Sequence, residues 1–423
     1  MSSSSTQRSS VVSRRAAALE RTRKRMGKFF RENQVLGRRS AIGCVALEIT
    51  QRCNLDCTLC YLSANSEAVK DTPLPALIRR LEAIRDRFGA PTTVQITGGE
   101  PTLRERGELT EIVRRARGLG LLPALVTNGI KATRDLLKEL ASAGLSEVAF
   151  HVDVTQERVG YASERDLNAV REEYLERARG IPIAVGVSAT VCRENFGEIP
   201  DLVRFFRKHA DVVRLVSFQL QADTGRGVLR ERDPIISLES VREQIDRGAG
   251  TRISWDTILI GHPACHRIGV TLEVNGNLYD WNDDPHFFNR SLANLEDVKL
   301  DRRHPGRMVL ALAREATHRP GFLLEGARFL GPKIWQMRRD LVAARGRIHK
   351  LSFFLENFMD ASTLDAERIH ACSFMVQTAD GPISMCEHNA KRDEFILKPF
   401  EAADDGSGLW DPRTGKVMLP VVH

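Results

Sequence analysis

Three closely spaced cysteines are the residues of this chain best suited to chemistry. Cys53, Cys57 and Cys60 follow directly after the apolar, β-branched run Cys44–Thr50, which is typical of a strand. Three thiolates on one loop can ligate three irons of a [4Fe–4S] cluster and leave the fourth iron without a protein ligand. A structural zinc site would need a fourth protein ligand nearby, and three cysteines cannot all pair within one tight loop. We interpret the loop as the ligand set of an iron–sulfur cluster with one open iron.

A glycine pair forms the second motif. Gly98 and Gly99 precede Glu100 and Pro101 at the end of another strand pattern, about 40 residues after the cysteine loop. Glycines at the end of a strand allow the backbone to approach a ligand closely and expose main-chain polar groups to it. Alone, such a segment would be an ordinary turn before a helix. Its place after the cysteine loop makes it specific.

With both motifs in this order, the chain resembles the radical SAM superfamily. The resemblance implies that Gly98, Gly99 and Glu100 contact the amino group of S-adenosylmethionine (SAM), whose amino and carboxylate groups chelate the open iron. It also implies that the cluster on the three cysteines is catalytic. Its electron, from a flavodoxin- or ferredoxin-type donor, would cleave SAM into methionine and a 5′-deoxyadenosyl radical that abstracts hydrogen from substrate.

The elements that position these motifs alternate between strand and helix patterns. The strand patterns are residues 44–50, 93–97, 123–127, 147–152, 183–191 and 212–220, and helical patterns lie near 73–88, 103–119, 133–143, 165–178 and 198–209. Six βα repeats with near-continuous apolar strands imply parallel strands that are buried on both faces. The sequence predicts an α/β fold: a partial (β/α)6 TIM-like barrel over residues 41–225.

Polar residues mark the carboxyl ends of several predicted strands. Asn128, Asp153, Ser188 and Gln219 lie at four such ends, where barrels of this type bind ligands. Each also has an ordinary interpretation as a turn residue or a helix cap. Together we expect them to line the cavity for SAM and substrate.

Three later cysteines predict a second cluster. Cys265, Cys372 and Cys386 each lie beside a turn pattern, and Asp380-Gly381 would hold the last two close together across a hairpin. Separated cysteines of this kind can ligate an auxiliary iron–sulfur cluster, although three buried, inert thiols are the alternative. The fourth ligand of this cluster could be substrate or one of four side chains, which are His388, His370, His262 and Asp380.

The length of the chain and its apolar runs indicate what lies outside the barrel and where the protein works. The 423 residues exceed one barrel, so we expect a carboxyl-terminal α+β substrate and auxiliary-cluster domain over residues 226–423. No apolar run approaches the ~18–20 residues of a membrane span, and the amino terminus lacks the apolar region of a secretory signal. Thiolates on iron need a reducing compartment, which favours the cytoplasm.

The positive charge is concentrated at one end. Residues 1–40 contain nine Arg, two Lys and two Glu, a net charge of +9, against +7 for the whole chain. We expect a basic, largely disordered tail, in which residues 11–30 can form a basic helix. A solvated tail and peripheral contact with an anionic membrane are both open. No aromatic platform or known motif accompanies the charge to indicate nucleic-acid binding.

The carboxyl-terminal cysteines, together with residues 218–226, resemble the archaeal tetraether-lipid synthase subgroup and its bacterial relatives. This resemblance implies radical C–C bond formation or alkylation on a hydrophobic, lipid-like substrate. Residues 321–354 read as an amphipathic helix, either packed on the barrel or lying on a membrane or acyl chain. The alternatives are methylation or oxidation of a small heterocycle or peptide, and a regulatory iron–sulfur protein. The intact glycine motif favours an enzyme.

Overall fold

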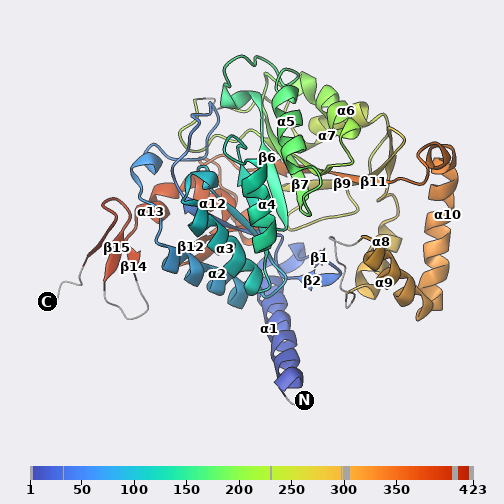
Figure 1. The fold of residues 1–423 in the computed structure, drawn as a ribbon, viewed down its shortest axis with the longest axis horizontal. Helices are drawn as coiled ribbons and strands as arrows, with labels where there is room; N and C mark the ends of the chain where they lie inside the picture. Colours follow the sequence, from blue (N-terminus) through green and yellow to red (C-terminus); the bar gives the residue numbers. More distant parts are fainter. Residues whose placement is uncertain are drawn as a thin grey trace.

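One sheet runs through the molecule (Figure 1), and both sets of cysteines lie in segments that adjoin its strands. The structure is a computed structural model that describes residues 3–31, 33–228, 231–296, 298, 305–402 and 408–418. Within these residues the sheet has eleven strands in the order β10-β9-β11-β8-β7-β6-β5-β4-β3-β12-β13.

The middle of the sheet is the partial (β/α)6 barrel that the sequence predicts. Its six neighbouring strands are parallel: β3 (Cys44–Thr50), β4 (Thr93–Gly98), β5 (Leu122–Thr127), β6 (Glu147–His151), β7 (Ala184–Val191) and β8 (Val213–Leu220). The helices between them are α2 (Leu74–Phe88), α3 (Arg106–Gly118), α4 (Arg134–Ala143), α5 (Asn168–Ala178) and α6 (Ile199–Lys208). The predicted fold class is therefore confirmed.

Burial of apolar side chains between helices and sheet holds this barrel together. Leu77, Leu81 and Ile84 lie on one face of α2 and are fully buried against strand residues such as Leu47 and Ile96. The i, i+4 and i+7 spacing places all three on the same face of the helix. Each such side chain contributes about 1.5–3 kcal/mol on leaving water. The sheet is thereby a rigid base for the loops at its carboxyl end.

The carboxyl-terminal half extends the same sheet at both edges. On one side β11 (His349–Asn357) pairs parallel to β8, followed by antiparallel β9 (His266–Val274) and β10 (Asn277–Asp280). On the other side β12 (Phe374–Thr378) pairs parallel to β3, and β13 (Gly381–Ser384) pairs with β12. The predicted boundary at residues 225 and 226 stays a prediction, although strands from both sides of it share one sheet.

Two predicted turns are found where the sequence places them. Asn275 and Gly276 join β9 to β10 with φ of 53° and 81°, the left-handed pair typical of a tight hairpin. The Asp380-Gly381 turn joins β12 to β13, and it leads the chain into α12 (Met385–Ala390), which carries Cys386.

The remaining elements cover the sides of the sheet. They are α7 (Leu238–Ala249), α8 (Pro285–Asn294), α9 (Pro305–Thr317), α10 (Pro320–Ala343), α11 (Ala366–His370), α13 (Arg392–Ile396) and a small sheet of β14 (Phe400–Glu401), β15 (Leu409–Asp411) and β16 (Lys416–Met418). The helix expected over residues 321–354 was too long. Arg345 and Gly346, both with positive φ, follow α10, and the chain then enters β11. No helix in the described part of the chain is long and apolar enough to cross a membrane.

The amino-terminal segment differs from the disordered tail that we expected. Residues Ser3–Met26 form α1, and β1 (Asn33–Val35) pairs with β2 (Arg38–Ser40), while residues 1, 2 and 32 lie outside the described residues. Arg25 donates hydrogen bonds to the carbonyls of His370 and Cys372 at 2.8 and 2.7 Å. These partners lie more than 340 residues away, so composition near the amino terminus could not reveal them.

Candidate functional site

The cysteine loop lies directly against the glycine motif. Gly99 N–H donates to the Thr50 carbonyl at 2.9 Å, and Glu100 N–H donates to the Arg52 carbonyl at 2.8 Å. A Cβ atom on Gly98 would stand 2.0 Å from the Thr50 oxygen, and one on Gly99 would stand 2.3 Å from the Arg52 oxygen. Both glycines are therefore required by close backbone packing, a role additional to the predicted contact with SAM.

The same loop is held from its other side by the segment after β8. Arg226 N–H donates to the Cys60 and Leu62 carbonyls, and Val228 N–H donates to the Thr58 carbonyl at 2.7 Å. Gly225, with φ of 70°, comes so close that a Cβ would stand 2.2 Å from the Cys60 oxygen. The loop is thus clamped between the ends of β4 and β8, on opposite sides of the barrel mouth.

The three thiols fit the ligand set of a cluster with one open iron. All three are partly buried. Burial raises the pKa of Cys57, and the nearby Asp153, Cys60 and Cys53 raise it further, so the three sulfurs are electrostatic neighbours. Metal binding replaces the thiol protons. In a [4Fe–4S] cluster each thiolate binds a different iron, so the sulfurs need not converge on one point. Accordingly, no three ligand side chains among the described residues converge on a single ion position.

Glu100 is buried and ties the strand ends together. Its Oε1 accepts hydrogen bonds from Thr102 and from the Thr127 hydroxyl at 2.7 Å, and its Oε2 accepts from the Asn128 N–H at 2.7 Å. Asn128 in turn donates through Nδ2 to Asn54, between Cys53 and Cys57, at 2.8 Å. Both Glu100 oxygens are therefore occupied within the protein. The carboxylate positions the loop after β5 against the cysteine loop.

Asp153 and Ser188 surround a histidine. His151 Nε2 lies 2.7 Å from Asp153 Oδ2, and its Nδ1 lies 3.0 Å from the Ser188 hydroxyl. Burial opposes ionisation of Asp153, but the His151 charge and hydrogen bonds from His151, Thr155 and Thr190 dominate and lower its pKa to about 2. Burial works against protonation of His151, yet Asp153 raises its pKa above the ordinary value. The strand ends thus hold an ion pair beside the cysteine loop.

This pair gives a defined pH dependence. The depressed Asp153 pKa stabilises the fold above about pH 4 and the gain is lost as pH falls toward 2. The raised His151 pKa adds stability below about pH 6.5 that is lost as pH rises through its folded value. We expect Asp153→Asn to cost roughly 2 kcal/mol of unfolding free energy near pH 5–6. The cost should shrink below pH 4, as followed by urea unfolding at a series of pH values.

An exposed aspartate serves as the matched control. Asp86 has a side chain that is 63% exposed and pairs with Arg14 and Arg85, whose side chains are 56% and 34% exposed, so Asp86→Asn should change stability by less than about 1 kcal/mol at each pH. A cost of Asp153→Asn that stays constant from pH 3 to pH 7 would contradict the ion pair.

Gln219 contacts a buried acid that the sequence did not reveal. Glu356 on β11 accepts hydrogen bonds from the Ser217 hydroxyl at 2.6 Å and from Gln219 Nε2 at 3.1 Å. Burial raises the pKa of Glu356, with those hydrogen bonds acting in the opposite direction. Glu356 lies two residues beyond the helix expected over residues 321–354, where no strand was predicted, and the pairing of β11 with β8 was the missing information. Gln219 and Glu356 thus form a polar pair at the carboxyl ends of β8 and β11.

The three later cysteines lie together, as the sequence predicts they would. Cys265, Cys372 and Cys386 line one cavity with largely apolar walls. Burial raises the pKa of Cys372 to about 12, and the neighbouring Cys386 and Cys265 add to the effect. Arg368 donates through Nε to the Cys265 sulfur at 3.3 Å, and it also reaches the Asn357 carbonyl. The donor set of three thiols beside a fixed cation fits an iron–sulfur cluster.

None of the four side chains considered as a fourth ligand lines this cavity. His388 lies within 3.9 Å of Glu48, and Asp380 pairs with Lys398. His370 ends α11, where its Nδ1 lies 2.7 Å from the Ala366 carbonyl, and His262 lies 3.7 Å from Glu367 of the same helix. His266 lines it instead. Burial and the charges of Arg368 and Arg267 lower the pKa of His266 to about 3, so its imidazole is neutral.

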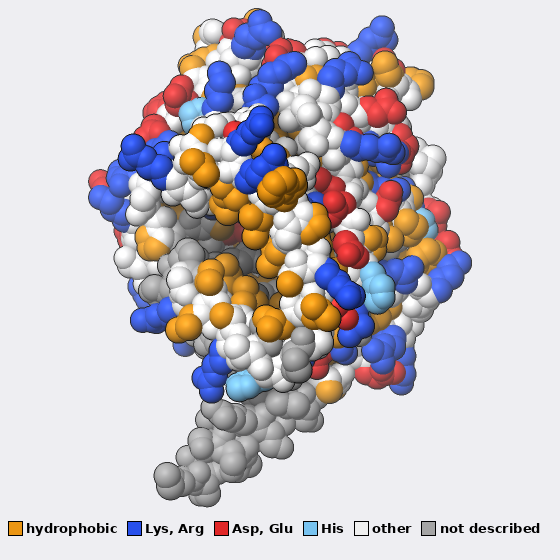
Figure 2. Space-filling view, turned by 90° about the vertical axis from the view of Figure 1, so that its right-hand side faces the viewer, with side chains coloured by type: hydrophobic (Ala, Val, Ile, Leu, Met, Phe, Trp, Pro, Cys, Tyr) orange, Lys and Arg blue, Asp and Glu red, His pale blue; other side chains and the backbone are white. Residues whose placement is uncertain are grey.

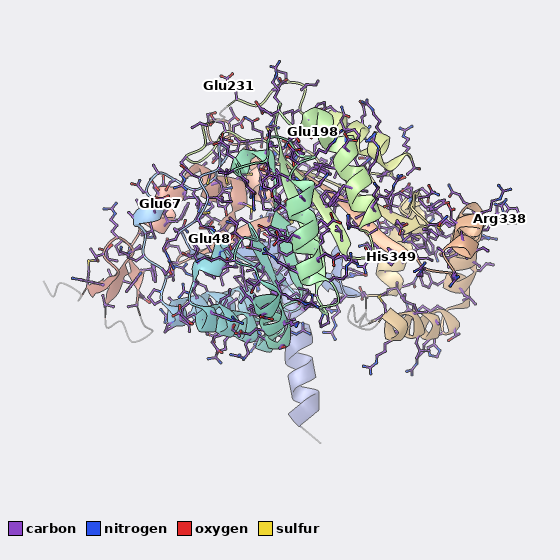
Figure 3. The ribbon with its side chains drawn as sticks, turned by 45° about the horizontal axis from the view of Figure 1, so that its top comes forward. Glu48, Glu67, Glu198, Glu231, Arg338 and His349 are labelled. Carbon is purple, nitrogen blue, oxygen red and sulfur yellow. The ribbon has the colours of Figure 1, made fainter. Side chains whose placement is uncertain are left out.

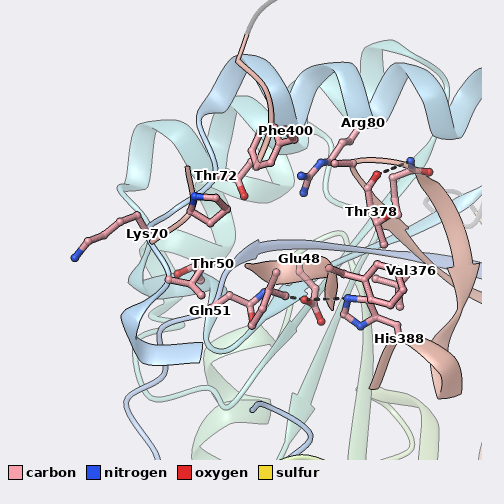
Figure 4. A pocket seen from close by; sticks show the side chains of 16 residues that line it. Glu48, Thr50, Gln51, Lys70, Thr72, Arg80, Val376, Thr378, His388 and Phe400 are labelled. Carbon is pink, nitrogen blue, oxygen red and sulfur yellow. Dashed lines mark hydrogen bonds and ion pairs between the residues drawn. The ribbon is translucent and has the colours of Figure 1, made fainter. Parts of the chain in front are cut away.

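A second cavity, which has polar walls, lies between the residues just before the cysteine loop and the carboxyl-terminal segment. Figure 4 shows Glu48 between Gln51 and His388, and the Glu48 side chain is only 9% exposed. Arg392 Nη1 lies 2.9 Å from each Glu48 oxygen, and its guanidinium lies 4.6 Å from the ring centre of Tyr61, next to Cys60. Burial opposes ionisation of Glu48, but Arg392 and His388 lower its pKa to about 2. The ion pair thus packs directly on the cluster loop.

Comparison with known proteins identifies the family of this chain. Residues 47–206 match the sequence model of the radical SAM superfamily. The 7,8-dihydro-6-hydroxymethylpterin dimethyltransferase of Methanocaldococcus jannaschii is 32% identical over 405 residues, which cover 84% of this chain and 78% of that protein. The chain therefore belongs to the radical SAM superfamily.

Other relatives match over shorter regions. The PqqA peptide cyclase of Bradyrhizobium diazoefficiens is 30% identical over 38% of this chain and 42% of its own length. Among solved structures, SuiB of Streptococcus suis bound to S-adenosylmethionine is 15% identical with a TM-score of 0.39, over 49% of this chain and 47% of that one.

Membership defines the enzyme class and the cofactors. The chain is an enzyme that uses a [4Fe–4S] cluster and S-adenosylmethionine. The chemistry that these groups supply, when bound, is reductive cleavage of S-adenosylmethionine to a radical that abstracts hydrogen. The assignment of Cys53, Cys57 and Cys60 as cluster ligands, and of the adjacent glycine motif as the contact for S-adenosylmethionine, stays a prediction.

Proposed function

We propose that this enzyme forms a C–C bond, or alkylates, at an unactivated carbon of a hydrophobic, lipid-like substrate, as the resemblance to the tetraether-lipid synthase subgroup implies. The observation that carries the proposal is a row of exposed apolar side chains on α9 and α10. These are Val309, Leu310, Leu323, Leu324, Ile334 and Trp335.

These apolar side chains are strongly exposed. Leu310 is 70% exposed and Trp335 is 68% exposed, and Figure 2 shows apolar side chains gathered on the face that carries these helices. A contiguous exposed apolar patch marks a binding surface more often than single exposed residues do. Arg338, at the periphery in Figure 3, lies 3.9 Å over the Trp335 ring. A cation beside an indole suits a lipid with a polar head.

Polar groups at the strand ends would orient the substrate. His151, Ser188, Gln219 and Glu356 come from neighbouring strands of the barrel, and the cysteine loop borders the same carboxyl ends. Burial raises the pKa of Glu356, which lies among these strand ends. A shielded site is needed because a carbon radical must meet the substrate before it meets solvent.

The substrate class is tested by measuring whether a candidate substrate raises the rate of SAM cleavage and is converted to product. With flavodoxin as reductant, isoprenoid or fatty-acyl substrates should raise 5′-deoxyadenosine formation above the uncoupled rate. Mass spectrometry should then show a product that has lost hydrogen at an alkyl carbon. Stimulation by pterins or short peptides alone, with no effect of any acyl or isoprenoid chain, would contradict the lipid proposal.

The second candidate is methylation of a small heterocycle. It is favoured by the name of the M. jannaschii relative, which describes transfer of methyl groups to a pterin. A methylating enzyme would yield S-adenosylhomocysteine together with 5′-deoxyadenosine, whereas C–C coupling would yield 5′-deoxyadenosine without it. The nucleoside products thus separate the two candidates.

We also propose that Cys265, Cys372 and Cys386 hold an auxiliary [4Fe–4S] cluster. The cavity that they share and the cation at Cys265 support this proposal. A full-length variant with Cys53, Cys57 and Cys60 all replaced by alanine should retain about four irons and four sulfides per chain after anaerobic reconstitution. If this variant binds no iron, the three later cysteines are structural.

For the cell, we propose a cytoplasmic enzyme with a flavodoxin- or ferredoxin-type electron donor. Peripheral membrane contact through the basic α1 is part of this proposal, since Arg14 and Arg23 are more than half exposed there. Cosedimentation with vesicles of anionic lipid, lost at high salt, would support it, because surface charge attraction is screened by ions.

A further inference from the structure

The cavity that the three later cysteines share is also lined by His266, whose ring has a nitrogen atom able to bind a metal. His266 follows Cys265, begins β9 and is only 8% exposed. It lines the same cavity as the three cysteines. Its Nδ1 is buried and has no hydrogen-bond partner in the part of the chain that the structure describes. Buried polar atoms without a partner are uncommon in folded proteins, and an unrecorded ligand is one of their usual causes.

The orientation of this ring is fixed by its surroundings. Nε2 lies 3.4 Å from the Ser373 hydroxyl, and Ser373 is itself held because its carbonyl accepts hydrogen bonds from Gly43 and Cys44. The ring stacks on Phe354 with 5.4 Å between centres and packs on Phe374 at 4.7 Å. When Nε2 carries the proton toward Ser373, the lone pair is on Nδ1. Metal-binding histidines commonly show this arrangement, with the other ring N–H on a hydrogen-bond acceptor.

The other polar side chains around the cavity are poorer ligands. Arg368 is permanently protonated and has no lone pair to offer. The Asn357 amide is occupied, because its nitrogen donates to the Ala264 carbonyl and its oxygen accepts from Arg232. The Ser384 hydroxyl accepts the N–H of Glu387 at the start of α12. His266 is therefore the side chain with both the chemistry and the free atom for a metal.

We propose that Nδ1 of His266 is the fourth protein ligand of the auxiliary cluster, alongside Cys265, Cys372 and Cys386. The inference rests on the proposed auxiliary cluster and adds a role to it. A cluster with four protein ligands has no open iron, so it cannot bind substrate or S-adenosylmethionine directly. Its iron atoms can then take part only by one-electron transfer, with the flavodoxin- or ferredoxin-type donor proposed above as the source of the electron. Replacement of a thiolate by a neutral imidazole also raises the reduction potential, so this cluster accepts electrons readily.

The test uses the nitrogen of the ligand itself. The full-length variant that lacks Cys53, Cys57 and Cys60 is produced with ¹⁵N-labelled histidine, reconstituted, and reduced with dithionite. Pulsed EPR should show a ¹⁵N coupling of the size of a directly bound imidazole. His266→Ala should remove that coupling, whereas His262→Ala should leave it unchanged. His262 is a fair control because its ring packs on Phe29, away from the cavity.

The outcomes separate the two proposals. Iron in the labelled protein without a histidine coupling, or a coupling that persists in His266→Ala, overturns His266 as ligand and leaves the auxiliary cluster in place. Absence of iron removes the auxiliary cluster itself. The presence or absence of the ¹⁵N coupling in the labelled protein with His266 intact tests the proposal even if His266→Ala fails to fold. In addition, His266→Cys should lower the midpoint potential, because a thiolate replaces a neutral ligand.

Discussion

Replacement of Cys57 by alanine is expected to abolish 5′-deoxyadenosine formation. Cys57 lies at the centre of the loop that is clamped between β4 and β8, and its sulfur is the electrostatic neighbour of both other loop thiols. Loss of one of three thiolate ligands leaves the cluster with two. The rate of SAM cleavage under dithionite should fall at least 100-fold, measured by chromatography of the nucleoside products.

The matched control is Cys192→Ala. Cys192 is also buried, but it lies beyond β7, and its N–H is held by Asn195. This variant should keep the iron content and the cleavage rate of the original protein within about twofold. Cleavage that survives in Cys57→Ala at more than a tenth of the original rate would mean that the loop is not the site of cluster binding.

Replacement of Arg392 by methionine is expected to give the largest loss of stability that we predict. Arg392 and Glu48 have side chains that are 2% and 9% exposed, and Arg392 supplies two hydrogen bonds to the carboxylate. Removal of one partner leaves a buried charge uncompensated, which costs about 3–5 kcal/mol. Urea unfolding at pH 7 should show this cost. Because Arg392 also covers Tyr61, the variant should lose affinity for iron at the neighbouring loop.

Two further variants identify the cause. Lys391→Met changes the adjacent residue, whose side chain is 45% exposed and pairs with Glu387, so it should cost less than about 1 kcal/mol. Glu48→Gln combined with Arg392→Met removes both charges, and it should recover part of the lost stability. If the double variant is less stable than Arg392→Met by the full cost of a second buried change, the two residues do not act as a pair.

The sequence predicts the barrel well because its signal is local. Each strand from β3 to β8 is a short apolar run, and each following helix carries an apolar face, so the alternation is visible without knowledge of pairing. The glycine motif and the cysteine loop are also local. Their mutual packing, with a Gly98 Cβ position 2.0 Å from the Thr50 oxygen, is a consequence of two strands being neighbours.

What the sequence did not predict depends on contacts between distant segments. Residues 351–355 form a short apolar run, and periodicity alone cannot separate a buried strand from a helix there, so Glu356 was not identified. His388 is only two residues from Cys386, but the short α12 turns it toward Glu48 and away from the cavity. His266 is recognised only when β9 and β12 are placed in the same sheet.

The clamp around the cysteine loop has a consequence for biosynthesis. The main-chain hydrogen bonds that hold this loop are made by residues up to Val228, whereas the later cavity is complete only with Cys386, 158 residues further along. At about 5–20 residues per second, roughly 10–30 s of translation separate the two points. The first metal-binding loop can therefore form while the ribosome is still extending the chain. The second depends on strands toward both edges of the sheet, so iron can be delivered to it only after Cys386 has been translated.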